Sequence, residues 1–391
     1  MEEFLMPCKE RVLTNNRHKR LRIGVPSEDP KEETRLALTP QGVEVLVAQG
    51  HEVVVESKAG QEARFSDKQY AEAGARIVDS HAEAYDADIV MRITLPKNDD
   101  LQYVKSGQTI IAFALLGNIE TTTYKTLSEK KCNILALDFI SDGDGEPIIS
   151  RCLGEIEGML AVTTAAHLLE KSADGKGIII GGVTGVPPTE VVILGSGMAA
   201  MSAARVASSL GATVKVFDNM HSHLQALSLQ LNRNIFTSIL HPQALVKAMK
   251  TADVVIGTRG IAGSNTFFAT EDNIKLLKKG AVVIDLNMAL GGRFETSKAT
   301  TIESATFICD NIIHHCLPDI TVLAPHTATI MLSDILTPAL TTIGNLGNYE
   351  DALRADGNVR RGTIMLRGVT TNEFVAKKFG ADYFDIKLML L

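Results

Sequence analysis

Residues 191–200 constrain the fold more than any other stretch of this chain, because they combine a buried strand, a glycine-rich turn and the start of a helix. The run reads Val-Val-Ile-Leu-Gly-Ser-Gly-Met-Ala-Ala, and a helical pattern continues to Leu210. The first glycine permits the tight turn, the second lets a pyrophosphate approach the backbone, and the last alanine allows close packing of helix on strand. The helix N-terminus offers unpaired N–H groups and a partial positive charge to a phosphate. We therefore predict that a dinucleotide binds at Gly195, Ser196, Gly197 and Ala200.

The residues after the next predicted strand indicate which dinucleotide would bind. This strand, residues 213–217, ends at Asp218, about 20 residues beyond the turn, where a carboxylate can accept hydrogen bonds from both ribose hydroxyls. The next residues are Asn219, Met220 and His221, so no arginine or lysine follows at once. A 2′-phosphate would meet the carboxylate without a compensating cation. The sequence therefore favours NAD over NADP as the cofactor.

Composition and charge narrow the class of protein. The chain has 391 residues, of which 45% are hydrophobic and 22% charged, as in soluble globular proteins, and it is long enough for two domains. A formal net charge of −7 argues against a nucleic-acid-binding surface. Several lysines and arginines lie between residues 9 and 22. We expect residues 1–20 to form a solvated N-terminal arm, in preference to a binding patch.

The cysteines and the apolar runs of the sequence indicate the cellular compartment in which the protein is expected. The five cysteines form neither a CxxC motif nor an even framework, which is typical of a reducing compartment. The first residues lack the apolar segment of a signal peptide, and no apolar run approaches the roughly 18 residues of a membrane span. We expect a cytoplasmic protein without membrane insertion.

Two polar clusters contain residue types that bind metal ions. His314, His315 and Cys316 are consecutive, and adjacent residues of a strand point to opposite faces. The acidic residues within 141–146 lack the spacing of a calcium-binding loop and are interpreted as a turn. No metal site is predicted.

Strand-like and helical patterns alternate from residue 21 to about residue 325, which predicts an α/β fold with mainly parallel sheets. A long helix expected at residues 154–171 and a Gly/Pro-rich loop after it separate two sheet units. The tail is predicted to return to the first unit, because a separate domain of that size would be small. The expected strands are residues 21–26, 51–56, 89–93, 108–114 and 133–137, then 191–194, 213–217, 234–237, 254–257, 281–285 and 306–309. The expected domains are a substrate domain (21–152 plus 311–391) and an NAD-binding domain (153–310).

The ends of the second unit's strands supply further candidates, because ligands of such folds bind beyond the carboxyl ends of parallel strands. Thr258 and Leu286 each follow a predicted strand and are therefore expected to line the cofactor. Asp285 has two readings that the sequence leaves open. It is either a functional group at the strand end or a carboxylate that caps the following loop.

Several motifs in combination make the chain resemble the family of alanine dehydrogenases and transhydrogenase α subunits, over almost its whole length from residue 21. They are residues 22–26 with 33–40, the run Gly-Gly-Val-Thr-Gly-Val-Pro-Pro-Thr at 181–189, residues 252–257, and 284–285 followed by the glycine pair 291–292. The resemblance implies two Rossmann-like, doubly wound domains with an active cleft between them, the first domain being built from both chain ends. It also implies a homo-oligomer, often a hexamer among the soluble dehydrogenases.

The substrate site that the resemblance implies is partly changed. Arg35 occupies the position of the arginine that binds the substrate carboxylate in alanine dehydrogenases, and a guanidinium can grip a carboxylate bidentately. The family's substrate-binding lysine falls on Thr94. Arg92 lies two residues earlier on the same strand face, where it could reach the ligand or form a salt bridge.

The proton-handling residues of the family are replaced as well. Its catalytic histidine falls on Leu115 and an aspartate falls on Ala289, neither of which can exchange a proton. Oxidative deamination needs a proton acceptor near the amino carbon. The replacement candidates are Asp319, which stands in the family's Asn-x-Pro element together with Thr321, and His326. Each is also compatible with a hydrogen-bonded loop residue.

Three functions follow from these residues. The first is NAD-dependent oxidative deamination of a small L-amino acid, most simply alanine to pyruvate and ammonia, by hydride transfer, with Arg35, Arg92 and Asp319 as catalytic candidates. The second is an NAD-binding protein of the same fold with altered catalysis. The third is the NAD-binding α subunit of a proton-translocating transhydrogenase, whose partners would be a membrane domain and an NADP-binding protein. We expect the first, with a small amino or keto acid as the partner molecule.

Overall fold

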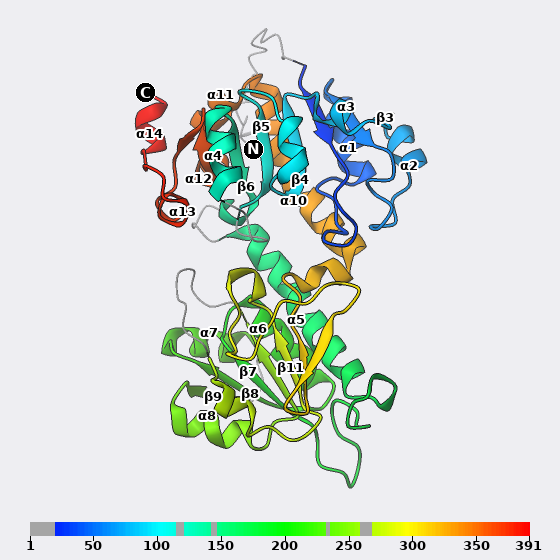
Figure 1. Cartoon of the computed structure of the whole chain (residues 1–391), viewed down its shortest axis with the longest axis vertical. Helices are drawn as coiled ribbons and strands as arrows, with labels where there is room; N and C mark the ends of the chain where they lie inside the picture. Colours follow the sequence, from blue (N-terminus) through cyan, green and yellow to red (C-terminus); the bar gives the residue numbers. More distant parts are fainter. Residues whose placement is uncertain (1–19, 115–120, 142–146, 232–234, 259–267) are drawn as a thin grey trace, which may run out of the picture.

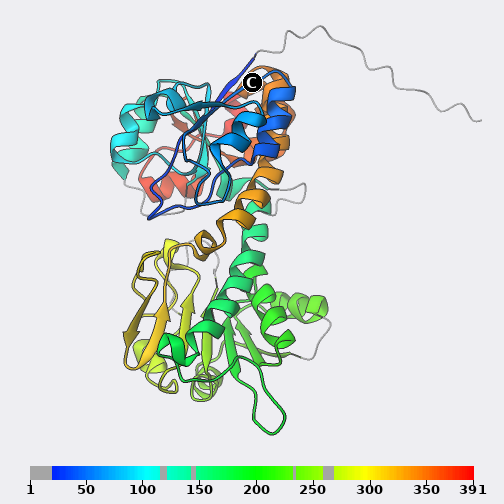
Figure 2. The same ribbon diagram turned by 90° about the vertical axis from the view of Figure 1, so that its right-hand side faces the viewer.

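The computed structural model describes residues 20–114, 121–141, 147–231, 235–258 and 268–391, which form two α/β domains stacked along the long axis of the molecule (Figure 1). Each domain is built on one mainly parallel sheet. Two long helices, α5 (Ile148–Leu168) and α10 (Pro325–Leu346), run between the domains (Figure 2). The predicted pair of Rossmann-like domains is confirmed.

Within the described residues, the first domain contains an eight-stranded sheet in the order β15-β14-β6-β5-β4-β1-β2-β3. Its strands are β1 (Arg22–Val25), β2 (Glu52–Glu56), β3 (Arg76–Val78), β4 (Ile89–Thr94), β5 (Thr109–Phe113), β6 (Asn133–Ala136), β14 (Thr363–Leu366) and β15 (Val369–Thr370). Neighbours from β3 to β6 are parallel, whereas β14 pairs antiparallel with both β6 and β15. Strands β14 and β15 of the C-terminal tail thus extend the first sheet.

Apolar side chains cover both faces of this sheet, which explains the continuous apolar runs of its strands. In β4, for example, Ile89, Met91 and Ile93 lie in one apolar cluster and Val90 lies in another on the opposite face. The surrounding helices are α1 (Pro40–Ala48), α2 (Asp67–Glu72), α3 (His81–Tyr85), α4 (Thr121–Glu129), α11 (Tyr349–Ala355), α12 (Gly357–Gly362), α13 (Glu373–Phe379) and α14 (Ile386–Met389), with 3-10 turns η1 (Asn98–Gln102) and η2 (Leu137–Phe139).

The second domain contains, in the described residues, a seven-stranded sheet in the order β12-β13-β11-β10-β7-β8-β9. Its strands are β7 (Glu190–Leu194), β8 (Thr213–Asp218), β9 (Phe236–Ile239), β10 (Val254–Gly257), β11 (Val282–Asp285), β12 (Thr306–Cys309) and β13 (Ile312–His315). Its helices are α6 (Met198–Ser209), α7 (His221–Leu231), α8 (Pro242–Met249) and α9 (Glu271–Ile274), with η3 (Lys171–Ala173), η4 (Met288–Leu290) and η5 (Ile320–Leu323). Only β12 runs antiparallel to its neighbour. Strand β13 lies in this sheet, although the second domain was expected to end at residue 310. The exact domain boundaries stay a prediction.

Helix α5 contributes to the cores of both domains. Ile149 and Leu153, in its first turns, belong to the core of the first domain, whereas residues from Ala161 onward belong to the core of the second. The helix begins at Ile148, six residues before the expected start at residue 154. A Cβ at Gly154 would lie 3.2 Å from the backbone nitrogen of Ala199, so this glycine lets α5 approach α6 closely.

The same crossing of α5 and α6 is closest at Gly158. A Cβ there would lie 2.2 Å from the carbonyl oxygen of Ala199 and 2.6 Å from the nitrogen of Ala203. Replacing glycine by alanine in a helix normally stabilises by about 1 kcal/mol. We predict that Gly158→Ala instead lowers the free energy of unfolding by about 2 kcal/mol, because the backbone of α6 must move. Urea denaturation measures the change.

The matched control is Gly357→Ala at the start of α12. There a Cβ would meet only the guanidinium ends of Arg360 and Arg361, at 3.5 Å. This variant should leave the free energy of unfolding unchanged within about 0.5 kcal/mol or raise it slightly. Equal stability changes for the two variants would contradict the proposed tight crossing.

Candidate functional site

The turn after β7 has the backbone that a dinucleotide-binding turn requires. Gly195 has φ 106°, a value that side chains other than glycine rarely adopt. Gly197 is the N-cap residue of α6, and a Cβ there would meet no atom of the described residues within 4 Å. The space above Gly197 is therefore open as far as the described part of the chain is concerned, while Ala200 is fully buried. These residues fit a bound pyrophosphate at the N-terminus of α6.

Two of the predicted cofactor residues contact each other. The Ser196 hydroxyl donates a hydrogen bond to Oδ2 of Asp218 at 2.7 Å, and Oδ1 of Asp218 accepts one from the Met220 amide at 2.8 Å. Both bonds orient the carboxylate at the end of β8, beside the turn after β7. This is the position in which a carboxylate can accept hydrogen bonds from ribose hydroxyls.

The other strand-end candidates are buried. Thr258 is 1% exposed, and both its amide and its hydroxyl donate to the carbonyl of Leu194, directly before the glycine turn. Leu286 is 5% exposed and belongs to the core of the second domain. Asp285 accepts hydrogen bonds from the Asn287 and Arg293 amides and from the Ser297 hydroxyl. Of its two readings, the loop cap is the one that the structure shows.

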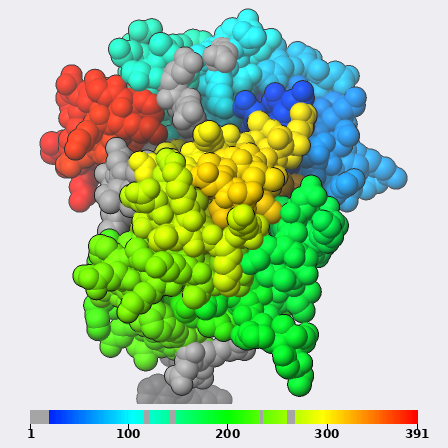
Figure 3. Space-filling model, turned by 60° about the horizontal axis from the view of Figure 1, so that its bottom comes forward, coloured from blue at the N-terminus to red at the C-terminus, as the bar shows by residue number. Residues whose placement is uncertain are grey.

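A pocket of about 400 Å³ lies between the two domains. It is lined by Lys31, Glu32, Glu33, Arg35, Thr94, Lys97, Thr300, Thr301, Ile302, Leu317, Pro318, Asp319 and Val322. The structure thus brings together three residues singled out from the sequence, Arg35, Thr94 and Asp319. In Figure 3 the second-domain segment near residue 300 (yellow) lies against the first-domain segment after β1 (dark blue). A larger hollow of about 490 Å³ lies at the opposite ends of β1, β4 and β5, away from these residues.

Arg35 lies in a buried charge cluster, which we call the Arg35 cluster and which comprises Glu33, Arg35, Asp319 and Thr321. The guanidinium donates to both oxygens of Glu33, at 2.7 Å each, to Asp319 at 2.8 Å and to the Thr321 hydroxyl at 2.5 Å. The Arg35 side chain is 0% exposed. Burial disfavours its charge, but Asp319 and Glu33 outweigh burial and raise the pKa of Arg35. The cluster joins the loop after β1 to the segment before α10.

The backbone around Arg35 is held by the same C-terminal segment. The Thr34 hydroxyl donates to the carbonyl of Val322 at 2.6 Å. The amides of Leu36 and Thr39 donate to the hydroxyls of Thr329 and Ser333 on α10, at 2.9 Å and 3.0 Å. The motif at residues 33–40 is therefore a docking site for α10 as well as the carrier of Arg35.

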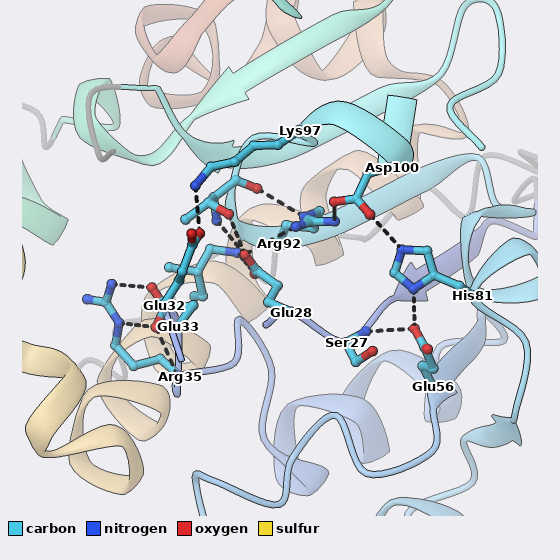
Figure 4. A network of polar contacts seen from close by, with 12 residues as sticks. Ser27, Glu28, Glu32, Glu33, Arg35, Glu56, His81, Arg92, Lys97 and Asp100 are labelled. Atoms are coloured by element: carbon cyan, nitrogen blue, oxygen red, sulfur yellow. Dashed lines mark hydrogen bonds and ion pairs between the residues drawn. The ribbon is translucent and has the colours of Figure 1, made fainter. Parts of the chain in front are cut away.

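Arg92 points into a different polar network, shown in Figure 4. Its guanidinium donates to the Tyr85 hydroxyl at 2.5 Å and to Asp100 at 2.6 Å, and its side chain is 5% exposed. Arg92 does not line the interdomain pocket. Thr94 does, but its hydroxyl donates to Glu28 at 2.5 Å. The expectation that Arg92 reaches the substrate stays a prediction, and the structure shows its alternative role as a salt-bridged residue.

Three of the four positions linked to proton transfer lie within the described residues. Leu115 lies outside the described residues, and Ala289 lies in η4, partly buried against the core of the first domain. Asp319 lines the pocket, and its Oδ1 accepts hydrogen bonds from the amide and hydroxyl of Thr321. His326 lies in the first turn of α10 rather than in a loop, and it is hydrogen-bonded there: Nδ1 lies 2.7 Å from the carbonyl oxygen of Ala63, and the ring stacks on Phe65.

Sequence reasoning missed the two lysines of the pocket. Lys97 follows β4 directly after Pro96, and its Nζ lies 2.9 Å from Glu32. Lys31 lies in the loop after β1, 3.8 Å from Glu303 of the second domain. The available signal was the lysine that stands three residues after Thr94, the position on which the family's substrate-binding lysine falls.

No helix among the described residues combines the length and apolar character that crossing a membrane requires. No group of three or more histidine, cysteine or acidic side chains in these residues is placed to hold a metal ion.

Comparisons with known proteins agree with this arrangement. The family model "Alanine dehydrogenase/PNT, N-terminal domain" matches residues 24–149, and "Alanine dehydrogenase/PNT, C-terminal domain" matches residues 161–373. "Alanine dehydrogenase 2" of Staphylococcus aureus (strain Mu50) is 33% identical over 369 residues, which are 94% of this chain and 99% of the relative. A solved L-alanine dehydrogenase has a TM-score of 0.84 at 27% identity, covering 92% of this chain and 99% of its own. A transhydrogenase from Sinorhizobium meliloti has a TM-score of 0.75 at 20% identity, covering 90% and 99%, and shares the fold.

The Arg35 cluster generates a prediction about stability. Arg35→Met leaves Glu33 and Asp319 buried without their cation, so the free energy of unfolding at pH 7.5 should fall by about 3–5 kcal/mol. Burial raises the pKa of Glu33 even beside Arg35, and removal of the cation raises it further. Since protonation relieves an uncompensated buried carboxylate, the loss should be smaller at pH 5 than at pH 7.5. Urea denaturation at both pH values measures it.

Arg205→Met on the exposed side of α6 serves as the control and should change the free energy of unfolding by less than about 0.5 kcal/mol at either pH. A deficit in Arg35→Met that grows on acidification would refute the proposed charge balance.

The network in Figure 4 generates a second prediction. Hydrogen bonds to Asp100 and Glu56, at 3.1 and 2.7 Å, raise the pKa of His81 to about 9. A histidine whose pKa is raised on folding stabilises fully below its unfolded pKa of about 6.5, and this contribution is lost as the pH rises through 9. The stability difference between the wild type and His81→Asn should therefore shrink by roughly 1–2 kcal/mol between pH 6 and pH 9.5.

His223→Asn, on the exposed face of α7, is the matched control and should show no such trend. The measurement is chemical denaturation of all three proteins at both pH values. A pH-independent difference for His81→Asn would show that the ring is not held in its charged form.

Proposed function

The chain belongs to the alanine dehydrogenase/PNT family, and on this basis we propose that it is an NAD-dependent oxidoreductase of a small L-amino acid. The proposed reaction is oxidative deamination, most simply of alanine to pyruvate and ammonia. The observation that carries the proposal is the pair Ser196 and Asp218, hydrogen-bonded at the carboxyl ends of β7 and β8, beside the open backbone at Gly197. A nicotinamide cofactor is the group that this family uses, and NAD is the form that Asp218 favours.

The chain's own residues supply binding and orientation. Gly197 and the N-terminus of α6 would hold the pyrophosphate, and Asp218 would hold the ribose. NAD bound in this way supplies the hydride acceptor. Asp319, which lies on the wall of the interdomain pocket and is ion-paired with Arg35, is the candidate for accepting a proton from the substrate.

A second function is favoured by a specific observation. Four hydrogen bonds to Glu33, Asp319 and Thr321 engage the Arg35 guanidinium, and the family's histidine and aspartate are replaced by Leu115 and Ala289. An NAD-binding protein of this fold with altered catalysis would keep the dinucleotide turn and lose turnover.

One assay separates the two functions. NADH formation is followed spectrophotometrically with a panel of L-amino acids, and NADH oxidation with pyruvate plus ammonium. Turnover supports the dehydrogenase, and tight NADH binding without turnover on any acid supports altered catalysis. Failure to bind NADH at all would contradict both.

The cofactor site has its own prediction. Asp218→Ala removes the acceptor for the ribose hydroxyls and should weaken NADH binding roughly tenfold, while the discrimination against NADPH should decrease because the negative charge is gone. Isothermal titration calorimetry measures both affinities. Asp79→Ala, an exposed aspartate of the first domain, should bind NADH like the wild type.

A further inference from the structure

The interdomain pocket carries two lysines at its exposed rim. Lys97 is 34% exposed and pairs at 2.9 Å with Glu32, which is 63% exposed. Lys31 is 73% exposed and lies 3.8 Å from Glu303. Ion pairs this exposed contribute little to stability, so an incoming carboxylate can replace Glu32 beside Lys97 at small cost.

Arg35 is poorly placed to exchange partners in the same way. Its side chain is fully buried, and it holds Glu33 through Nε and Nη2 and Asp319 through its third nitrogen, Nη1. A substrate carboxylate that displaced either acid would leave a buried carboxylate without its cation, which is strongly unfavourable. Asp319 and Thr321 stand where the resemblance expects asparagine and proline, and both bind Nη1 of Arg35. These two departures from the family pattern, Asp319 and Thr321, therefore both contact the same guanidinium.

Thr94 does not replace the missing lysine by itself. It lines the pocket, but its hydroxyl donates to Oε2 of Glu28 and its amide donates to the same oxygen. Glu28 in turn is held by the amide of Ile93 at 2.6 Å. The end of β4 is thus a rigid support, from which the next segment carries Lys97 to the pocket (Figure 4).

We infer that Lys97 binds the carboxylate of the small amino or keto acid in this pocket, in place of Glu32. The inference rests on the proposed function, because it assigns that substrate's carboxylate to a particular side chain. Lys97 is a compact cation with three N–H donors on a flexible stem, which suits a carboxylate at the rim of a pocket.

The charge of the buried wall sets the orientation of the ligand. Two carboxylates, Glu33 and Asp319, face a single guanidinium there, so the wall carries an excess of negative charge. An amino acid bound with its carboxylate at Lys97 would direct its ammonium group toward Asp319. That orientation brings the group that loses a proton to the candidate proton acceptor.

The test measures binding of two matched probes by calorimetry, with and without saturating NADH. The probes are pyruvate, which carries the carboxylate, and methyl pyruvate, which lacks the charge. Lys97→Met should weaken pyruvate binding about tenfold or more and leave methyl pyruvate and NADH within about twofold of the wild type. Lys97→Arg should retain most of the affinity. Glu32→Gln, which removes the competing carboxylate, should tighten pyruvate binding by about two- to fivefold.

Lys68→Met, an exposed lysine of α2, is the control and should bind every probe like the wild type. The inference is overturned if Lys97→Met binds pyruvate as the wild type does, or if the wild type binds no carboxylic acid of the panel. Lys97-dependent pyruvate binding without turnover would reject the proposed reaction and support the inference. Turnover together with pyruvate binding that does not depend on Lys97 would support the proposed reaction and reject the inference.

Discussion

The buried ion pairs of Arg35 connect the parts of this protein that function requires. Charges removed from water are tolerated only when they are paired and hydrogen-bonded, so Glu33, Arg35 and Asp319 must assemble together. Arg35 and Asp319 are separated by 284 positions in the sequence. Their contact therefore joins the loop after β1 to the segment that leaves the second domain, and it defines one wall of the pocket between the domains.

The two long helices, α5 and α10, also hold the two domains in position relative to each other. Helix α5 places apolar residues in both cores, and its glycines let α6, which starts at the dinucleotide turn, approach closely. Helix α10 docks through Thr329 and Ser333 on the backbone that carries Arg35. The glycine turn after β7 and the interdomain pocket are thus both positioned relative to the first sheet by direct packing.

Much of the fold was predictable because its signals are local. The strand, glycine turn and helix at 190–209 and the acid that ends β8 follow from short-range backbone geometry and spacing. The strands β3, β13, β14 and β15 were missed. For β3 and β15, which have three and two residues, the strand carries too little periodicity for recognition. The start of α5 was placed six residues too late, because the boundaries of a helix are less well marked in a sequence than its existence.

The sequence alone determined that a strand, a glycine turn and a helix start follow one another at the end of β7, that an acid ends β8, and which family the chain resembles, since each depends on neighbouring residues. Tertiary structure alone decided which polar groups meet across long separations. It placed Thr321 and Asp319 on Arg35, turned Arg92 toward Tyr85 and Asp100, and brought Lys97 to the pocket. A residue type specifies which bonds a side chain can form, but only the folded chain determines the partners, because burial makes those bonds obligatory.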